Sequence, residues 1–136
     1  MNSPNQIIDA RIETIESSYE FMLAFAAQGR DTDEGMTGGP PVREILSNLS
    51  SALMDLSEPV GISDSVLAMR EFAETLAADA VHARRAVELV LSRPRISSQL
   101  VDNLNATIHL RSVLTDLFLI DEALKCQKTA SEEQIS

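Results

Sequence analysis

The chain has 136 residues, a formal net charge of −10 at pH 7 and hydrophobic residues at 44% of its positions. This length fits one domain, and the apolar fraction is typical of a globular protein rather than a disordered one. Nucleic acids and anionic membranes attract basic surfaces, so we expect this acidic chain to bind neither. Aromatic residues make up only 4%, which indicates an aliphatic core of the kind found in helical bundles.

The first residues carry neither the basic nor the apolar region of a signal peptide, and no stretch approaches 18 uninterrupted apolar residues. Cys126 is the one cysteine, so no disulfide can form within the chain, which fits a reducing compartment. We therefore predict a cytoplasmic protein whose single domain spans residues 1–127.

The first predicted helix covers about residues 4–28. Ser3 and Pro4 form a typical helix start, because serine caps an N-terminus and proline is favoured at the first helical position. Gly29 can end the helix. Between these signals, apolar residues recur at alternating intervals of four and three, which indicates a helix with one buried face. These residues are Ile8, Ile12, Ile15, Tyr19, Met22 and Ala26.

Residues 30–41 contain three glycines, two prolines and three acids, and we predict a long flexible loop of the kind that is often mobile or functional. Its acids at Asp31 and Asp33 follow the opening of a calcium-binding loop. The match fails further on, because Gly35 and Val42 stand at the fifth and twelfth positions, where ligands are required. A second helix is predicted at 42–57.

A third helix is predicted at 63–92, with Ser63 or Asp64 as its cap. Its heptad-like pattern is uninterrupted, and its middle is rich in alanine, which either allows close helix packing or leaves room for a pocket. After Pro94, Ser97 or Ser98 can cap a fourth helix at 97–125. We predict that the polar residues 128–136 form a disordered tail.

These elements predict an all-α protein, an up-down antiparallel four-helix bundle with one shorter helix. The short second helix would leave part of the bundle uncovered, and dimerisation could cover it. The apolar face of the fourth helix is also broader than packing against one neighbour requires. We therefore predict a homodimer, or a bundle in which the fourth helix is central.

Two histidines and an aspartate are the candidate metal ligands. In an antiparallel hairpin that turns near Pro94, His82 and His109 fall at about the same height, and Asp79 shares a helix face with His82. The neighbouring Arg84 and Arg85 would repel a cation, and the repeated inward Glu-x-x-His element of di-iron bundles is absent. We expect half-exposed surface histidines and no bound metal or cofactor.

We find no catalytic motif. Cys126 has no neighbouring histidine or helix N-terminus to activate it, and the sequence lacks a G-x-S-x-G element. The glycine-rich run in the loop is not followed by the Lys-Ser/Thr of a phosphate-binding loop. The acidic pairs at helical spacing are typical of solvated faces. We predict that the protein is not an enzyme.

The predicted function is that of a non-enzymatic accessory, assembly or regulatory protein that binds another protein. The mechanism would be burial of an apolar helix face, with charged residues setting the register. The alternatives are a bundle that binds a metal or a small ligand, and a homodimer that uses its apolar surplus for self-association. The candidate contact residues are Arg84, Arg85, Arg111, Val113, Leu117, Phe118 and Ile120.

Overall fold

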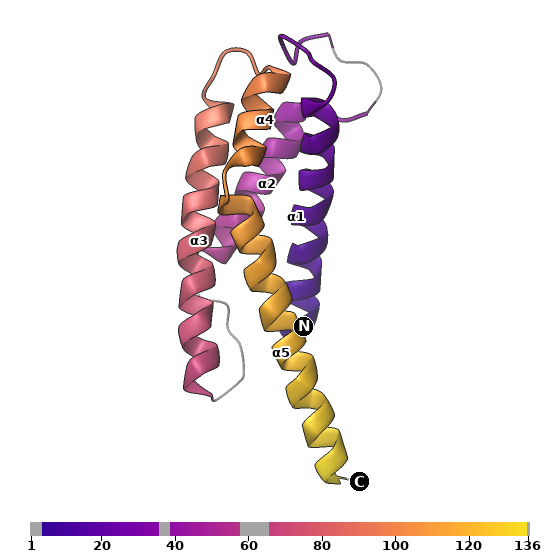
Figure 1. Cartoon of the computed structure of the whole chain (residues 1–136), viewed down its shortest axis with the longest axis vertical. Helices are drawn as coiled ribbons and strands as arrows, with labels where there is room; N and C mark the ends of the chain where they lie inside the picture. The colour runs from indigo at the N-terminus through magenta and orange to yellow at the C-terminus, as the bar shows by residue number, and fades with distance from the viewer. Residues whose placement is uncertain (1–3, 36–38, 58–65, 136) are drawn as a thin grey trace.

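The computed structural model describes residues 4–35, 39–57 and 66–135, with side chains for residues 6, 8–35, 39–57 and 66–126. This part of the chain is all-helical and contains no strand, as predicted (Figure 1). It forms five helices: α1 (Pro4–Ala26), α2 (Val42–Leu56), α3 (Leu67–Leu91), α4 (Ser98–Ala106) and α5 (His109–Ile135).

The prediction of one fourth helix at 97–125 is wrong, because the chain breaks at Thr107 and Ile108. Thr107 adopts an extended backbone (φ −67°, ψ 150°), and its hydroxyl donates to the Leu104 carbonyl at 2.7 Å. A side chain that competes for a helix carbonyl, on a β-branched residue, favours such an ending. The structure then continues α5 to Ile135, through the residues for which a disordered tail was predicted.

Other helix ends follow the signals in the sequence. α1 begins at Pro4, and Gly29 after it has a φ of 65°, the left-handed conformation that glycine adopts most easily. Ser97 caps α4 by accepting a hydrogen bond from the Leu100 amide at 3.0 Å. The predicted caps Ser3, Ser63 and Asp64 lie outside the described residues.

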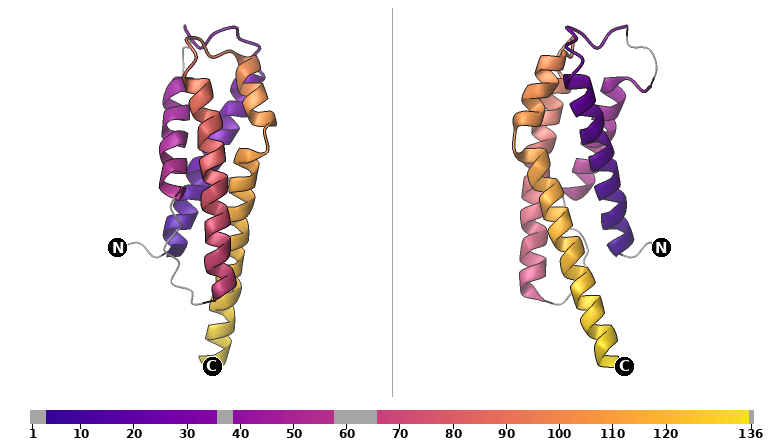
Figure 2. Two further views of the ribbon diagram at one scale, coloured as in Figure 1. Left: turned by 90° about the vertical axis from the view of Figure 1, so that its left-hand side faces the viewer. Right: turned by 45° about the vertical axis from the view of Figure 1, so that its right-hand side comes forward.

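The helices run alternately up and down the long axis, and α4 and α5 follow one another along one edge (Figures 1 and 2). Both α4 and α5 contact α1 and α3, while α2 contacts α1 and α3. The five helices therefore occupy the four positions of an up-down bundle. One cluster of buried aliphatic side chains, to which every described helix contributes, fills the centre.

The alanine-rich middle of α3 serves close packing. Ala73, Ala80 and Ala83 are almost fully buried. Because a methyl group takes little space, α5 can approach α3 closely there, as small residues at a helix contact allow. Of the two predicted consequences of these alanines, the structure therefore shows close packing at this level.

α2 ends long before α3 does. Ser50 donates a hydrogen bond to Glu88, which fixes the register of these antiparallel helices. Six residues further along α2, Leu56 therefore lies near the level of His82. At ~1.5 Å per residue, the first 15 residues of α3 extend roughly 22 Å past the last residue of α2. We call this part of the bundle, where α3 and α5 continue beyond α2, the distal end.

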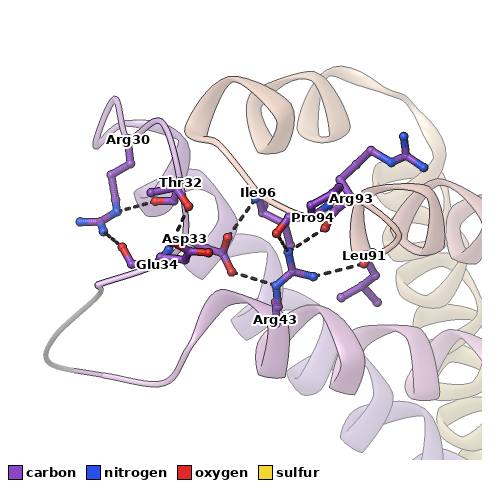
Figure 3. A network of polar contacts seen from close by, with 9 residues as sticks. All are labelled: Arg30, Thr32, Asp33, Glu34, Arg43, Leu91, Arg93, Pro94 and Ile96. Atoms are coloured by element: carbon purple, nitrogen blue, oxygen red, sulfur yellow. Dashed lines mark hydrogen bonds and ion pairs between the residues drawn. The ribbon is translucent and has the colours of Figure 1, made fainter.

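The opposite end, which we call the closed end, joins residues 30–34 to the turn between α3 and α4 (Figure 3). Arg43 lies at its centre. The Arg43 guanidinium donates to the carbonyls of Leu91, Arg93 and Pro94 at 3.2, 2.7 and 2.9 Å, and it pairs with Asp33 at 2.9 Å. One side chain thus satisfies carbonyls at the end of α3 and holds the loop against them.

Ser98 adds a second connection at the closed end. Its hydroxyl donates to the Phe25 carbonyl at 2.7 Å and accepts from the Arg30 amide at 2.8 Å, while the Ser98 amide donates to the Arg30 carbonyl at 2.8 Å. The loop predicted to be flexible is therefore tied down at its start. Its residues 36–38 lie outside the described part.

Asp33 completes this network. Burial alone would raise the pKa of Asp33, but hydrogen bonds from the Ile96 amide, from its own backbone and from Arg43, together with the Arg43 charge, hold the pKa below its usual value. Asp33 therefore stays ionised in the folded state, and its charge stabilises this state at pH values above the pKa of Asp33 in the unfolded chain.

Across the described ranges, no helix combines the length and hydropathy needed to cross a membrane.

We predict that Arg43→Met lowers the free energy of unfolding by about 2 kcal/mol, because three hydrogen bonds to a charged group are lost together with the pairing of Arg43 and Asp33. Urea denaturation at neutral pH measures the change. The loss should shrink as the pH falls below the usual pKa of an aspartate and through the lowered pKa of Asp33, where the ion pair is lost.

Arg95→Met is the matched control, because Arg95 is exposed in the same turn. Equal effects of the Arg43 and Arg95 substitutions would show that the network does not hold the closed end together.

Candidate functional site

An apolar groove of about 460 Å³ lies at the distal end, between the start of α3 and the middle of α5. Its lining side chains are almost all apolar, and Ile120, which is 1% exposed, belongs to the core beneath it. We call this the distal groove, and its residues are Val66, Ala68, Met69, Phe72, Leu119, Ile120 and Ala123.

Among the described residues, no other helix reaches the level of the groove. α2 has ended, and the salt bridge between Arg11 and Asp55 (3.0 Å) places the start of α1 only about two turns further along. Leu119 is 56% exposed, and Leu67, beside the groove, is 62% exposed. Large apolar side chains that lie together on a surface are typical of contact sites.

Acidic residues border the groove on the α3 side. A shallow depression of about 590 Å³ shares Ala68 and Phe72 with the groove and is also lined by Glu71 and Glu74. Both glutamates are exposed, and no described residue forms an ion pair with either. We call the surface around Glu71 and Glu74 the acidic shelf. Apolar and negatively charged surfaces thus meet at Phe72.

The structure divides the predicted contact face of α5 between core and surface. Val113, Leu117 and Ile120 are at most 1% exposed, so no partner can reach Val113 or Leu117 while α5 stays packed. These three residues lie on the apolar face of α5, but they pack into the core of the bundle. Phe118 is 46% exposed and remains available, next to Leu119 of the groove.

The predicted arginines do not join this site. Arg84 and Arg85 lie on α3 beside the end of α2, where they line a separate depression of about 380 Å³ together with Ser57, Val81 and Glu88. The Arg84 Nε atom is buried and has no hydrogen-bond partner in the described part of the protein. Arg111 is exposed on α5.

The two histidines do come together. The sequence placed His82 and His109 at about the same height, and the structure brings their ring centroids to 5.8 Å from one another. His82 is exposed and His109 is half-buried. Within the described ranges, no three His, Cys, Asp or Glu side chains are grouped so that they could hold a metal ion.

Asp79 lies instead beside Asp116, across the α3–α5 interface and close enough for a hydrogen bond between the two carboxyl groups. Two carboxyl groups can form such a bond only if one of them is protonated. Burial, then a hydrogen bond that protonated Asp116 donates to Asp79 and then the negative charge of Asp79 raise the pKa of Asp116 to about 7. The pair therefore titrates near neutral pH.

Another buried polar group lies at the end of α4. The Asn105 side chain is 6% exposed, and neither of its amide atoms has a partner among the described residues. Unpaired polar atoms in a core carry a desolvation penalty. Cys126, in contrast, is exposed on α5.

Most groove residues escaped the sequence analysis. Val66, Met69 and Phe72 belong to the predicted third helix, but none of them was predicted to be a contact residue. The sequence does contain a signal for these residues, because the second predicted helix ends near Pro59 and is much shorter than the third. When one of two neighbouring helices is longer, the shorter one cannot cover its whole apolar face.

We predict that stability falls as the pH rises through the titration of Asp116. The folded-state pKa of about 7 lies above the unfolded value of 3.8, so the folded protein binds the proton more tightly and loses stability between about pH 4 and 7. Asp116→Asn should remove this loss. At pH 8 the variant should exceed the wild type by on the order of 1 kcal/mol, after allowance for solvent screening.

Urea denaturation at pH 5 and pH 8 measures the difference. Asp102→Asn is the matched control, since Asp102 is exposed on α4. Parallel pH profiles for the wild type and Asp116→Asn would contradict the shared proton.

Comparison with known proteins adds no family to this description. No protein-family model, no curated protein and no solved structure matches the chain.

Proposed function

We propose that this protein is a non-enzymatic interaction protein, an accessory, assembly or regulatory factor that binds another protein through the distal groove. The observation that carries the proposal is the uncovered contact between α3 and α5, where Met69 and Phe72 face Leu119 and Ala123 around an open apolar groove. Protein contact sites concentrate apolar and aromatic side chains at their centre in this way.

The driving force would be the removal of apolar surface from water, at roughly 25 cal/mol per Å². Leu119 and Leu67 are each more than half exposed in the monomer, so a partner that covers them removes this exposed apolar surface from water. Because the backbone hydrogen bonds of both helices are already formed within each helix, binding requires little ordering of the main chain.

A small apolar ligand is a second candidate. The groove volume of about 460 Å³ lies within the range of small-molecule sites, which are mostly lined by apolar side chains. Mass spectrometry of ligands extracted from protein purified from its native host tests this reading. An apolar molecule retained by the wild type and lost in Phe72→Ala would support it.

The main test is affinity capture from the native host with three versions of the full chain as bait. Leu119→Glu places a charge in the groove, and Leu89→Glu makes the same change at a residue that is 63% exposed on α3, outside the groove. Quantitative mass spectrometry should find partners that are retained by the wild type and Leu89→Glu. Leu119→Glu should reduce them about thirtyfold, the loss expected for a contact worth about 2 kcal/mol.

Identical sets of captured proteins on all three baits would contradict the proposal. Sedimentation of the pure chain at several concentrations tests the predicted homodimer. A dimer that dissociates in Leu119→Glu but persists in Leu89→Glu would show that self-association occupies the groove.

A further inference from the structure

We propose that the occupant of the distal groove is an amphipathic helix of a partner protein, with an apolar face for the groove and a basic flank for the acidic shelf. This inference rests on the proposed function and specifies its partner. It joins two features described above, the open apolar groove and the unpaired glutamates that border it.

The first argument is the shape of the opening. The described lining of the groove comes from the start of α3 and the middle of α5, which run antiparallel (Figure 1). The side chains of two antiparallel helices leave a furrow between them into which a third helix packs. The groove therefore has a shape suited to a helix.

The second argument is the composition of the groove. Its walls come from Met69 and Phe72 on one side and from Leu119 and Ala123 on the other. An amphipathic helix presents apolar residues at positions i, i+3, i+4 and i+7, a stripe suited to such a furrow. Methionine in the wall can adapt its shape to a partner side chain.

The third argument is charge. Glu71 and Glu74 are exposed beside Phe72, without an ion pair in the described part of the chain, and the chain as a whole carries −10. A second copy would bring the same acidic shelf and the same net charge to the contact, and like charges oppose association. A helix with Lys or Arg beside its apolar stripe would instead meet opposite charge. The charge distribution therefore favours a basic partner over self-association.

The test uses the full chain and three fluorescent 14-residue peptides, followed by anisotropy. The first is a Leu/Lys peptide with its leucines on one helical face, the second has the same composition in scrambled order, and the third replaces Lys by Glu. We expect the amphipathic Leu/Lys peptide to bind about tenfold or more tightly than either of the other two. The affinity should fall as salt is raised.

Two pairs of variants locate the binding site. The double variant Glu71→Lys/Glu74→Lys should weaken the Leu/Lys peptide about tenfold. Its matched control is Glu20→Lys/Asp102→Lys, which changes the net charge equally at exposed positions outside the groove and the shelf. That control should alter the affinity less than about threefold. Leu119→Glu should weaken binding further, while Leu89→Glu should leave it unchanged.

The possible failures are distinct. Equal weakening by both charge-reversed pairs, or equal binding of the ordered and scrambled peptides, would mean general attraction to an acidic protein and would overturn the inference. A dimer that Leu119→Glu dissociates would assign the groove to a second copy and overturn it too. If Leu119→Glu loses captured partners while Glu71→Lys/Glu74→Lys keeps them, the proposed function stands and the basic helix does not.

Discussion

The surface of this protein depends on one constraint, which is that an apolar helix face is covered only as far as its neighbours extend. α2 has 15 residues and α3 has 25. The Ser50–Glu88 hydrogen bond sets the register of the two helices, and in this register the first 15 residues of α3 extend past the end of α2. The buried aliphatic cluster, the distal groove and the exposed Leu67 and Leu119 all follow from this offset.

The heptad-like spacing of apolar residues predicted the helical class and the up-down order, because burial of one face per helix leaves few other arrangements for short connections. Local signals also located ends at Pro4, Gly29 and Ser97. The break at Thr107 escaped the pattern, since the apolar periodicity continues across it and only a side-chain hydrogen bond to Leu104 marks the ending. Periodicity identifies the buried face of a helix, but it does not show where a side chain takes a backbone hydrogen bond and interrupts the helix.

The site was predicted less well than the fold, because its residues depend on register between helices. Val113, Leu117 and Phe118 all belong to one apolar stretch, yet the first two are buried and the third is about half exposed. Similarly, Asp79 shares a helix face with His82, but its partner proved to be Asp116, which lies 37 positions away in the sequence. Separations of this kind are set by how α5 lies against α3, and no local pattern contains that information.

The two ends of the molecule also differ in charge. At the closed end, the segments 27–45 and 91–99 contain four arginines and four acids, whereas acids outnumber bases in the segments 66–75 and 119–126, which contain the groove residues. This difference gives the molecule an electric dipole with its negative pole at the distal groove. In solution of low ionic strength, such a dipole turns during diffusion so that an approaching cation meets the distal end first. The charges would therefore affect the association rate of a complex more than its dissociation rate.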